Sequence, residues 1–479
     1  MECRICLPLI PTPKKATGVK EDGTFSFRTY PARIACSEKQ WKNYADAFSE
    51  DAKRVHGVSF AEGEGGLLLL CDRSVAAGHY RLIAAENALE LRAFSADGVT
   101  AGLASVLQLM RCDKAGFRIQ EVVIDDYPET DYRCFMIDLA RQWHPFEQVL
   151  RYVDICHLYK INKLQLHFID DQSYTLPSDI LPGLPTKDRH YTKEQIAYLN
   201  KYAADRGVTL IPEFEVPGHS RALVSAYPEK FSNIYDPEGI VGEDNIFCAG
   251  REGVFELIDS LIGEVCELFP DSPYIHLGGD EANRHIWDRC ELCREYMKKN
   301  GLAGSAQLYS HFMERVTNMV INRGRKPVVW EGFPKEGDGQ ISRDVIVIAW
   351  ESMYRYAPEL LESGFSIVNC SWQPNYIVPY SPAWSYSDIL AWNIYNWQNW
   401  NPGSPAHLNP FNVPPTDRVL GGMMCCWEWN YESEIGYVRS NLSALAERTW
   451  TIRRLCETEE FGAKLEEVLP VAERLTGLK

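Results

Sequence analysis

The chain has 479 residues, of which 45% are hydrophobic, and this length is sufficient for a large core and for two domains. Its 49 basic and 66 acidic residues give a net charge of −17, which disfavours nucleic acid and anionic membranes as partners. No apolar run reaches membrane-spanning length, and Met1 to Lys15 lacks the pattern of a secretion signal. We therefore expect a cytoplasmic protein with an acidic surface.

The 15 cysteines are odd in number and scattered along the chain, which is typical of reduced thiols in a cytoplasm. Two pairs have the Cys-x-x-Cys spacing, Cys3/Cys6 and Cys290/Cys293. Together they offer the ligand set of a zinc site. Coincidence in a cysteine-rich chain is the simpler interpretation, and we expect neither a metal nor a cofactor.

Residues 1–125 are predicted to form a small α/β domain that ends near the segment beginning at Val122. Apolar periodicity predicts three strands, Ser26–Ile34, Gly66–Cys71 and Ala88–Ala93, and two helices, Gln40–Val55 and Val99–Met110.

Residues 126–479 have a different texture, in which short apolar runs alternate with amphipathic helices, as in repeated βα units. Eight strands are expected: Arg133–Leu139, Lys163–Phe168, Val208–Glu213, Tyr274–Leu277, Pro327–Trp330, Val345–Trp350, Phe365–Cys370 and Val419–Trp427. Eight such units predict an α/β fold of the (β/α)8 TIM-barrel type. A doubly wound open sheet is the rival fold, but no glycine-rich dinucleotide loop follows the first strand.

Polar and aromatic residues collect at the carboxyl ends of these predicted strands, which is the catalytic end of a TIM barrel. They include Asp138, Arg141, His167, Glu213, His219, Asp280, Glu281, Trp330, Trp350 and Trp427. One carboxylate at a strand end has many structural explanations. Agreement among several strands favours an active site.

Asp280 and Glu281 follow two glycines, which allow a sharp turn and a close approach of the backbone to a ligand. Adjacent residues that leave a strand point in different directions, so the two carboxylates can face different parts of one ligand. Crowding in a partly dry pocket also raises one carboxyl pKa, as a general acid requires. The structural alternative is that Asp280 only caps the helix that follows.

Asp280 and Glu281 end the motif His276-Leu-Gly-Gly-Asp-Glu281, which follows Tyr132-Arg133 with Asp138-Leu-Ala-Arg141 and the run from Tyr159 to Gln172. The chain also contains Pro212-Glu-Phe-Glu-Val-Pro-Gly-His219-Ser and Ala444-Leu-Ala-Glu-Arg-Thr-Trp450. In these motifs the sequence resembles glycoside hydrolase family 20, and residues before 125 are similar to that family's small α/β domain.

The resemblance implies a β-N-acetylhexosaminidase that removes terminal GlcNAc or GalNAc from oligosaccharides or glycoconjugates by a retaining mechanism. In this family the substrate's own acetamido group attacks the anomeric carbon, an exception to the scheme with two enzymatic carboxylates. By resemblance, Glu281 is the general acid and base, and Asp280 orients the acetamido group and stabilises the oxazolinium intermediate.

The resemblance also implies a set of binding residues. Trp330, Trp350 and Trp427 would form the acetamido pocket, Tyr376 would donate to the acetamido carbonyl, and Arg133 would bind ring hydroxyls. Asp171 and His219 would order the general acid. Each tryptophan taken alone is more often core than ligand wall, and Arg133 has a salt bridge as its alternative.

The chain departs from the family pattern near the non-reducing end of the expected sugar. The usual Trp-x-Glu appears as Trp427-Glu428-Trp429, and we expect Glu428 to take the place of the displaced glutamate. The sugar epimer, the natural glycan and the oligomeric state stay open. The rival functions are a transglycosylase and a non-catalytic carbohydrate-binding barrel; a metal-dependent hydrolase would need a His-x-His motif that the first predicted strand lacks.

Overall fold

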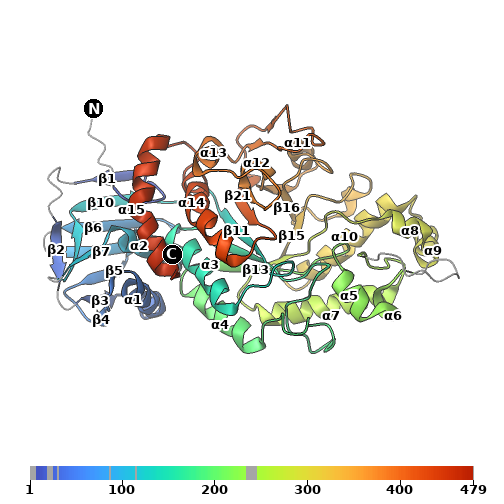
Figure 1. Cartoon of the computed structure of the whole chain (residues 1–479), viewed down its shortest axis with the longest axis horizontal. Coiled ribbons are helices and arrows are strands. Elements are labelled where there is room, and N and C mark those ends of the chain that lie inside the picture. The colour runs from blue at the N-terminus through green and yellow to red at the C-terminus, as the bar shows by residue number, and fades with distance from the viewer. Residues whose placement is uncertain are drawn as a thin grey trace.

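A computed structural model describes residues 7–18, 25–29, 32–85, 88–113, 116–233 and 245–477. The chain forms a small sheet domain packed against a barrel, and helix α15 (Thr458–Thr476) returns from the barrel to lie between them (Figure 1). Among the described helices none combines the length and apolar character needed to cross a bilayer. Cys3 and Cys6 lie outside the described residues.

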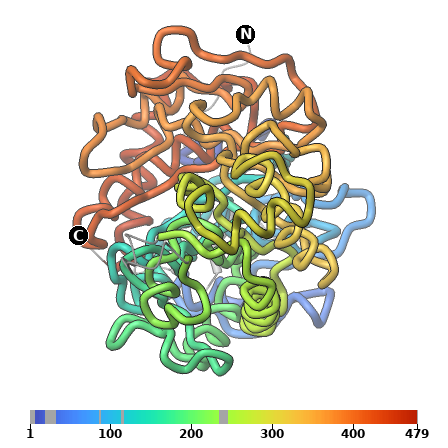
Figure 2. The backbone as a smooth tube through the Cα atoms, turned by 90° about the vertical axis from the view of Figure 1, so that its right-hand side faces the viewer, coloured from blue at the N-terminus to red at the C-terminus, as the bar shows by residue number. Residues whose placement is uncertain are grey.

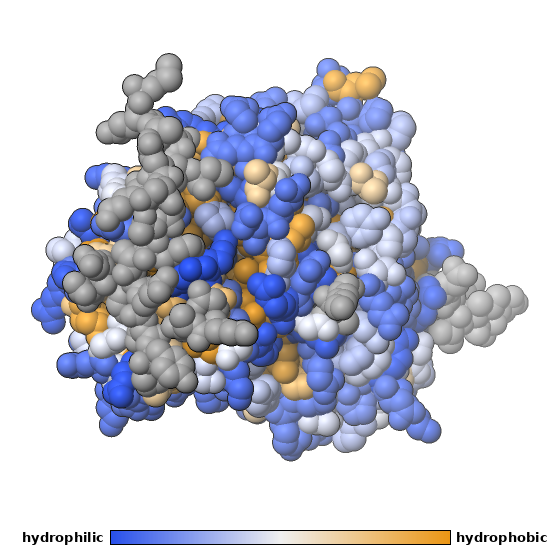
Figure 3. Space-filling view, turned by 60° about the vertical axis from the view of Figure 1, so that its left-hand side comes forward, coloured by the Kyte–Doolittle hydropathy of each residue, from blue (hydrophilic) through white to orange (hydrophobic). Residues whose placement is uncertain are grey.

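The first domain is built on a seven-stranded sheet whose strand order is β1-β10-β6-β7-β5-β3-β4. Its strands are β1 (Lys15–Thr17), β3 (Arg33–Cys36), β4 (Ala61–Glu62), β5 (Leu67–Cys71), β6 (Tyr80–Ala85), β7 (Ala88–Ala93) and β10 (Val122–Asp126). Helices α1 (Lys42–His56) and α2 (Ala96–Leu109) pack against it. The face that this domain presents is mainly hydrophilic, with apolar side chains in small groups (Figure 3), in keeping with the acidic composition.

The predicted strand Ser26–Ile34 is wrong as a single element. The chain makes two strands here, β2 (Phe25–Thr29) and β3, and they belong to different sheets. β2 pairs with β9 (Gly116–Gln120), which also pairs with β8 (Arg111–Asp113). In the sequence a proline follows β2, and because proline lacks an N–H donor and has a fixed φ, it disfavours one continuous strand over this range.

Eight parallel strands form the second domain and close into a barrel, because β11 pairs with both β12 and β21. These strands are β11 (Tyr132–Asp138), β12 (Lys163–His167), β13 (Thr209–Glu213), β14 (Tyr274–His276), β15 (Lys326–Trp330), β16 (Ile346–Ala349), β17 (Ser366–Asn369) and β21 (Val419–Cys426). The predicted barrel is therefore confirmed, and every predicted barrel strand overlaps an observed one.

Alternating side chains along each strand divide the core into two parts. In β11, Cys134 and Met136 join the cluster inside the barrel, whereas Phe135 and Ile137 pack outward against the helices. This two-residue period fills the barrel with side chains and buries its outer face. The interior of a barrel of this kind is a packed core, so a ligand has to bind at its end.

Helices cover the outside of the barrel, but one unit departs from the βα pattern. The main helices are α3 (Phe146–Leu158), α4 (Lys193–Ala204), α7 (Glu252–Leu268), α10 (Ser305–Ile321), α11 (Ala357–Glu362) and α14 (Tyr431–Trp450). Between β15 and β16, all of which is described, only the short 3-10 turn at Asp338–Gln340 occurs.

Short elements are added at the carboxyl ends of the strands. They are α5 (Arg221–Ala226), α6 (Pro228–Phe231), α8 (His285–Arg289), α9 (Glu291–Asn300), α12 (Trp372–Asn375), α13 (Tyr386–Ala391), β18 (Tyr376–Ile377), β19 (Asn396–Trp397) and β20 (Phe411–Asn412). Figure 2 looks at this side of the molecule, and the segment with α8 and α9 stands in front of the other loops.

A buried polar contact joins the two domains at the opposite end of the barrel. Asp126 ends strand β10, and its carboxylate lies 3.3 Å from Lys160 Nζ and accepts a hydrogen bond of 3.0 Å from Trp450 Nε1. Lys160 Nζ is also 2.9 Å from the hydroxyl of Tyr80. Burial lowers the pKa of Lys160, and Asp126 partly restores it. The charge of each partner is thus compensated only while both domains are in place.

We expect Asp126→Ala to destabilise the protein by about 3–5 kcal/mol, because it leaves the buried Lys160 ammonium without a counter-ion. Thermal and urea unfolding midpoints would measure the change. Glu62→Ala, which removes the solvent-exposed partner of Lys42 at 3.0 Å, is the control and should change little. Equal midpoints for the two variants would contradict the role given to Asp126.

Candidate active site

A pocket opens at the carboxyl ends of the barrel strands, where the sequence predicted it. It is lined by seven residues named from the sequence, Arg141, Asp280, Glu281, Trp330, Trp350, Tyr376 and Trp427, and by two others, Trp372 and Tyr380.

The two glycines before Asp280 are required by the path of the backbone. Gly278 and Gly279 have φ values of 62° and 91°. A Cβ atom on Gly278 would lie 1.8 Å from Glu215 Oε1, and Gly279 N donates to that same oxygen at 3.0 Å. The left-handed conformation and the close carboxylate both exclude a side chain, so this turn needs glycine.

The adjacent acids have different surroundings. The Asp280 side chain is 13% exposed, whereas that of Glu281 is 45% exposed. Asp280 is therefore placed deep in the pocket and Glu281 near its mouth. Glu281 has a φ of 46°, which is uncommon for a residue with a side chain and turns its carboxylate out of the strand direction.

Aromatic rings form the wall beside Asp280. The ring centroids of Trp330 and Trp427 are 5.9 Å apart, and Tyr376 stacks on Trp350 and Trp372 at 5.8 and 5.1 Å. Trp330 is fixed by a hydrogen bond of 2.7 Å from its Nε1 to Glu213 Oε1. The wall is thus rigid, flat and apolar, which suits a methyl group or the face of a sugar ring.

His219 lies between the two adjacent acids and a buried aspartate. Its Nδ1 is 3.3 Å from Asp170 Oδ1, and its Nε2 is 3.3 Å from Glu281 Oε2 and 4.0 Å from Asp280 Oδ2. Burial opposes a charged ring, but the contacts with Asp170 and Glu281 raise the pKa of His219 well above its usual value. The imidazole therefore carries a proton at neutral pH.

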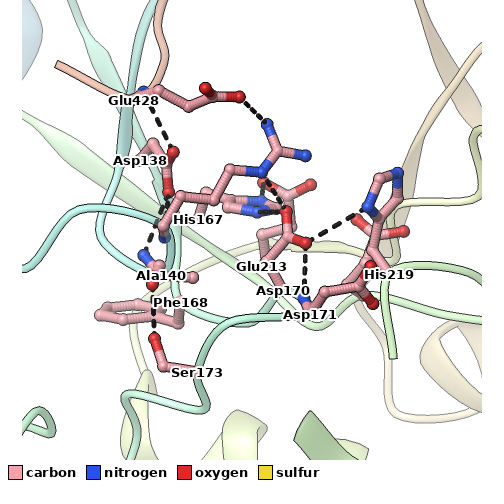
Figure 4. A network of polar contacts seen from close by, with 12 residues as sticks. Asp138, Ala140, His167, Phe168, Asp170, Asp171, Ser173, Glu213, His219 and Glu428 are labelled. Atoms are coloured by element: carbon pink, nitrogen blue, oxygen red, sulfur yellow. Dashed lines mark hydrogen bonds and ion pairs between the residues drawn. The ribbon is translucent and has the colours of Figure 1, made fainter. Parts of the chain in front are cut away.

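Asp170 is the shared partner of three cationic side chains, as Figure 4 shows in part. Besides His219, it contacts Arg141 Nε at 2.7 Å and His167 Nε2 at 2.9 Å. Burial alone would raise the pKa of Asp170, but the two histidines and Arg141 hold it well below the usual range. Arg141, His167 and His219 follow or end three neighbouring strands, so this carboxylate ties their ends together.

The contact with His219 that was expected of Asp171 is made by its neighbour Asp170. Asp171 accepts a hydrogen bond of 3.1 Å from Arg221 N, whereas Asp170 contacts His219. The sequence gives two consecutive aspartates, and consecutive residues point in different directions, so the motif alone does not say which one faces the site.

Inside the barrel, below the contacts of Asp170, the Glu213 carboxylate contacts four polar side chains. Its carboxylate receives hydrogen bonds from Gln165 and Trp330 and lies 3.0 Å from His167 Nδ1 and 3.1 Å from His276 Nδ1. Burial would raise the pKa of Glu213, but the two histidines keep it well below 4.5. These four contacts compensate the buried charge of Glu213 and fix the side chains at the bottom of the pocket.

The pKa values of the pair differ in the ligand-free site. Burial raises the pKa of Asp280 to about 7, against the opposing effect of His219 and with the help of the Glu281 charge. The contact with His219 lowers the pKa of Glu281. Glu281 is thus ionised beside a protonated histidine, while Asp280 titrates near neutral pH.

Three buried polar atoms of this pocket have no hydrogen-bond partner within the described parts of the chain. They are Asp280 Oδ1, Trp372 Nε1 and Trp427 Nε1. Buried polar groups are rarely left unsatisfied, and clusters of them mark places where a ligand supplies the missing partner. The set offers one acceptor and two donors to such a ligand.

The structure contradicts the binding role expected for Arg133. Arg133 stands at the amino end of β11, where Nε donates to Lys160 O at 2.9 Å and Nη1 donates to Thr130 O. Its guanidinium lies over the ring of Trp450 at 5.1 Å. A strand advances about 3.3 Å per residue, so the two ends of β11 are roughly 20 Å apart. Arg141, which the sequence analysis placed beyond the carboxyl end of the same strand, is the arginine in the pocket.

Glu428 lies beside two residues of the pocket lining, Arg141 and Tyr380. Its Oε1 lies 3.5 Å from Arg141 Nη1 and 3.4 Å from the hydroxyl of Tyr380. Its backbone N–H donates to Asp138 Oδ2 at 3.2 Å, and its φ is 61°. Trp429, which occupies the position of the usual glutamate, packs on Tyr437 instead. Glu428 and Arg141 thus offer an acceptor and a donor side by side.

His219, Asp280 and Glu281 are also close enough to share a metal ion. A histidine binds a metal through a neutral ring nitrogen. Because His219 is protonated and already faces Asp170, it compensates the carboxylates itself, and the arrangement suits proton transfer better than metal binding.

Comparison with known proteins places this geometry in a family. A model described as the glycosyl hydrolase family 20 catalytic domain matches residues 131–453, and one described as domain 2 of the same family matches residues 7–127. The chain belongs to glycosyl hydrolase family 20. Both of its domains correspond to domains of the family.

Curated relatives carry the name beta-hexosaminidase. One from Porphyromonas gingivalis is 31% identical over 57% of this chain and 37% of its own length. Another, from Vibrio furnissii, is 29% identical over 76% of this chain and 63% of its own length. The chain thus matches less than two thirds of the length of these family 20 relatives.

Solved structures of family 20 share the fold. A Vibrio harveyi exo-β-N-acetylglucosaminidase in complex with N-acetylglucosamine has a TM-score of 0.83 and 24% identity, covering 99% of this chain and 78% of its own. Flavobacterium johnsoniae chitobiase has a TM-score of 0.79 and 25% identity, covering 98% of this chain and 73% of its own.

Proposed function

We propose that the chain is a retaining β-N-acetylhexosaminidase that removes a terminal β-linked N-acetylhexosamine from an oligosaccharide or glycoconjugate. The observation that carries the proposal is the unequal placement of two consecutive acids, Asp280 deep beside an aromatic wall and Glu281 at the mouth. The beta-hexosaminidase relatives and the N-acetylglucosamine bound by the Vibrio harveyi enzyme support the same substrate class.

In this proposal the acetamido group of the sugar enters the aromatic part of the pocket. Trp330, Trp350 and Trp427 surround its methyl group and exclude water. Asp280 Oδ1, which otherwise lacks a partner, accepts the acetamido N–H. Tyr376 lies where it can donate to the carbonyl. The carbonyl oxygen is then held beside C1, and this tethering replaces several kcal/mol of entropic cost.

The first chemical step breaks the glycosidic bond. The acetamido oxygen attacks C1, the C1–O bond of the aglycone breaks, and Glu281 transfers its proton to the departing oxygen. An oxazolinium ring forms, and its positive charge lies next to the Asp280 carboxylate. A preorganised anion in a pocket that excludes water stabilises developing charge more than it would in solution.

The proton for this step comes from within the site. A protonated His219 with an ionised Glu281 has the same charge as a neutral His219 with a protonated Glu281. One proton is therefore shared by the pair, and a move from Nε2 to Oε2 over 3.3 Å prepares the acid. Asp170 keeps the imidazole in place from its other nitrogen.

The second step uses the same residues in reverse. Glu281, now a carboxylate and 45% exposed, takes a proton from water, and the water oxygen attacks C1. The C1–O bond of the oxazolinium ring opens, and the acetamido group is restored. Two inversions at C1 give net retention. Glu351, another carboxyl group near the pair, has its pKa raised to about 8 by burial and by Glu281 and Asp280, so it is protonated and unsuited to act as a nucleophile.

Glu281→Gln is expected to lower kcat/KM on N,N′-diacetylchitobiose by roughly 10²–10⁴-fold, because the leaving sugar needs a proton. The loss should be smaller on p-nitrophenyl β-N-acetylglucosaminide and its galacto epimer, whose leaving group is stable as an anion. Initial rates with all three substrates would measure this. Glu336→Gln, at an exposed position, is the matched control.

The attacking group is tested on the wild-type enzyme with a thiazoline analogue of the intermediate. Strong inhibition is expected, since the analogue resembles a state close to the transition state. An active enzyme that the thiazoline does not inhibit would indicate a carboxylate nucleophile. Wild-type activity of the Glu281→Gln variant would show that Glu281 is not the general acid.

The pH profile of kcat/KM should have an acid limb near pH 7. The pKa of Asp280 in the free enzyme is raised to about 7 by burial, and only its ionised form supports the intermediate. Below that pH the rate should fall about tenfold per unit, and an alkaline limb should follow loss of the proton shared by His219 and Glu281. An acid limb near 4, or one that persists unchanged in Asp280→Asn, would contradict this assignment.

Glu428→Gln is expected to lower kcat/KM by roughly 10- to 100-fold, because the proposal gives Glu428 and Arg141 the hydroxyls of the terminal sugar, and a charge-assisted hydrogen bond is lost. Steady-state rates with gluco and galacto substrates would measure the loss for each epimer. Glu432→Gln, an exposed glutamate in the first turn of α14, is the control. Identical kinetics for the two variants would place sugar recognition elsewhere.

A further inference from the structure

Three buried cysteines meet beside the active-site loops, and the proposed reaction does not use them. Cys248 lies in the loop before α7, Cys290 lies between α8 and α9, and Cys293 is in the first turn of α9. Cys248 Sγ is 3.7 Å from Cys290 Sγ and 3.7 Å from Cys293 Sγ. The three sulfur atoms all lie within 4.8 Å of one another.

These distances fit a shared metal ion and do not fit a disulfide. A disulfide bond brings its sulfur atoms to about 2.05 Å. Tetrahedral zinc at about 2.3 Å from each thiolate places the sulfur atoms about 3.8 Å apart. The separation of 3.7 Å between Cys248 and each of the other two agrees with the second geometry.

The backbone around the cluster is as compact as a metal-binding knuckle. A Cβ atom on Gly250 would lie 2.3 Å from the carbonyl carbon of Leu292, so Cys248-Ala-Gly250 approaches Cys290-x-x-Cys293 with no room for a side chain. Trp287 Nε1 donates to Phe247 O at 2.7 Å and closes the same contact. The segments that hold the sulfurs are thus fixed relative to each other.

Zinc binds cysteine as the thiolate, so binding at this cluster would release protons and stabilise the fold.

We propose that Cys248, Cys290 and Cys293 bind one structural Zn²⁺. Three soft thiolates in a tetrahedral arrangement select zinc over magnesium or calcium. Asn233 faces the same point: its Oδ1 is 3.7 Å from Cys293 Sγ, and its amide is oriented by a hydrogen bond of 2.9 Å from Nδ2 to Ile246 O. The fourth position is therefore filled by Asn233 Oδ1 or by a water molecule next to it. The cytoplasmic location expected from the sequence stays a prediction, and reduced thiolates are compatible with it.

The zinc would hold two active-site loops together. Phe247 N donates to Pro217 O and Ser220 N donates to Asn245 O, each at 3.1 Å, so the Cys248 loop lies against the loop of His219. Cys290 and Cys293 follow the catalytic pair in the chain. The metal would thus join the segment after Glu281 to the Cys248 loop, which packs against the segment that carries His219. Any effect on activity rests on the proposed function, whereas metal binding does not.

The metal content of the purified, untagged protein tests the proposal. Plasma mass spectrometry should find about one zinc per chain after exposure to zinc and desalting, as expected for a closed structural site. The double variant Cys290→Ser/Cys293→Ser should lose it. Cys156→Ser, which changes a buried cysteine of α3 away from the cluster, should retain it. Wild type without zinc, or zinc retained by the double variant, would overturn the site.

A second measurement covers the case in which the double variant does not fold. Wild-type protein prepared with Co²⁺ should show intense thiolate-to-cobalt charge-transfer absorption and the visible bands of tetrahedral cobalt, whatever its activity. Thiol titration of the unfolded protein should return these three cysteines as thiols. Octahedral cobalt bands, or a disulfide that includes any of the three, would overturn the proposal.

Discussion

The Asp170 carboxylate is the interaction on which the active site depends. It is buried and faces Arg141, His167 and His219, which stand at the carboxyl ends of the first three barrel strands. A buried anion with one cationic partner gains little from the pairing, because desolvation offsets the attraction. With three cationic partners the attraction outweighs the desolvation of Asp170. The strand ends are held in one register, and the imidazole that contacts Glu281 cannot turn away.

Charge in the pocket is distributed so that the acids can take different roles. Glu281 shares a proton with His219, whereas Asp280 lies in a drier place beside Trp330 and Trp427 and has no protein donor on Oδ1 among the described residues. Binding of an amide N–H there would favour the ionised form of Asp280. In the proposed reaction the bound substrate thus supplies the hydrogen bond that favours the ionised form of Asp280.

The barrel could be predicted from sequence because its signal is repeated. Each of eight strands gives a short apolar run, and errors in one run do not disturb the others. The first domain gives a weaker signal: the periodicity does not predict β6 or β10, and the single strand expected at Ser26–Ile34 is two strands, β2 and β3, in the structure. When two paired strands lie far apart in the chain, as β1 and β10 do, neither strand's own sequence indicates its partner.

The site could be predicted in kind but not to the residue. Asp280, Glu281, His219 and the tryptophans were found because glycines, strand ends and motif order all agree. The motifs indicate Arg133 and Asp171 as binding and positioning residues, whereas the structure places Arg141 and Asp170 at the site. A motif gives residue types, but the direction of each side chain depends on where the strand ends. Cys248 was not joined to Cys290 and Cys293, since their contact is a product of the tertiary fold.

His219, Glu281 and Glu428 share a left-handed backbone, with φ of 45°, 46° and 61°, although none is glycine. Such a conformation costs about 1 kcal/mol or more for a residue with a Cβ atom, and glycine at the same place relieves it. A search for more heat-resistant variants would therefore be drawn toward the very positions that carry acid, imidazole and hydroxyl recognition. If the proposed function holds, at these three of the described left-handed positions a gain in stability and the turnover of substrate compete for the same side chain.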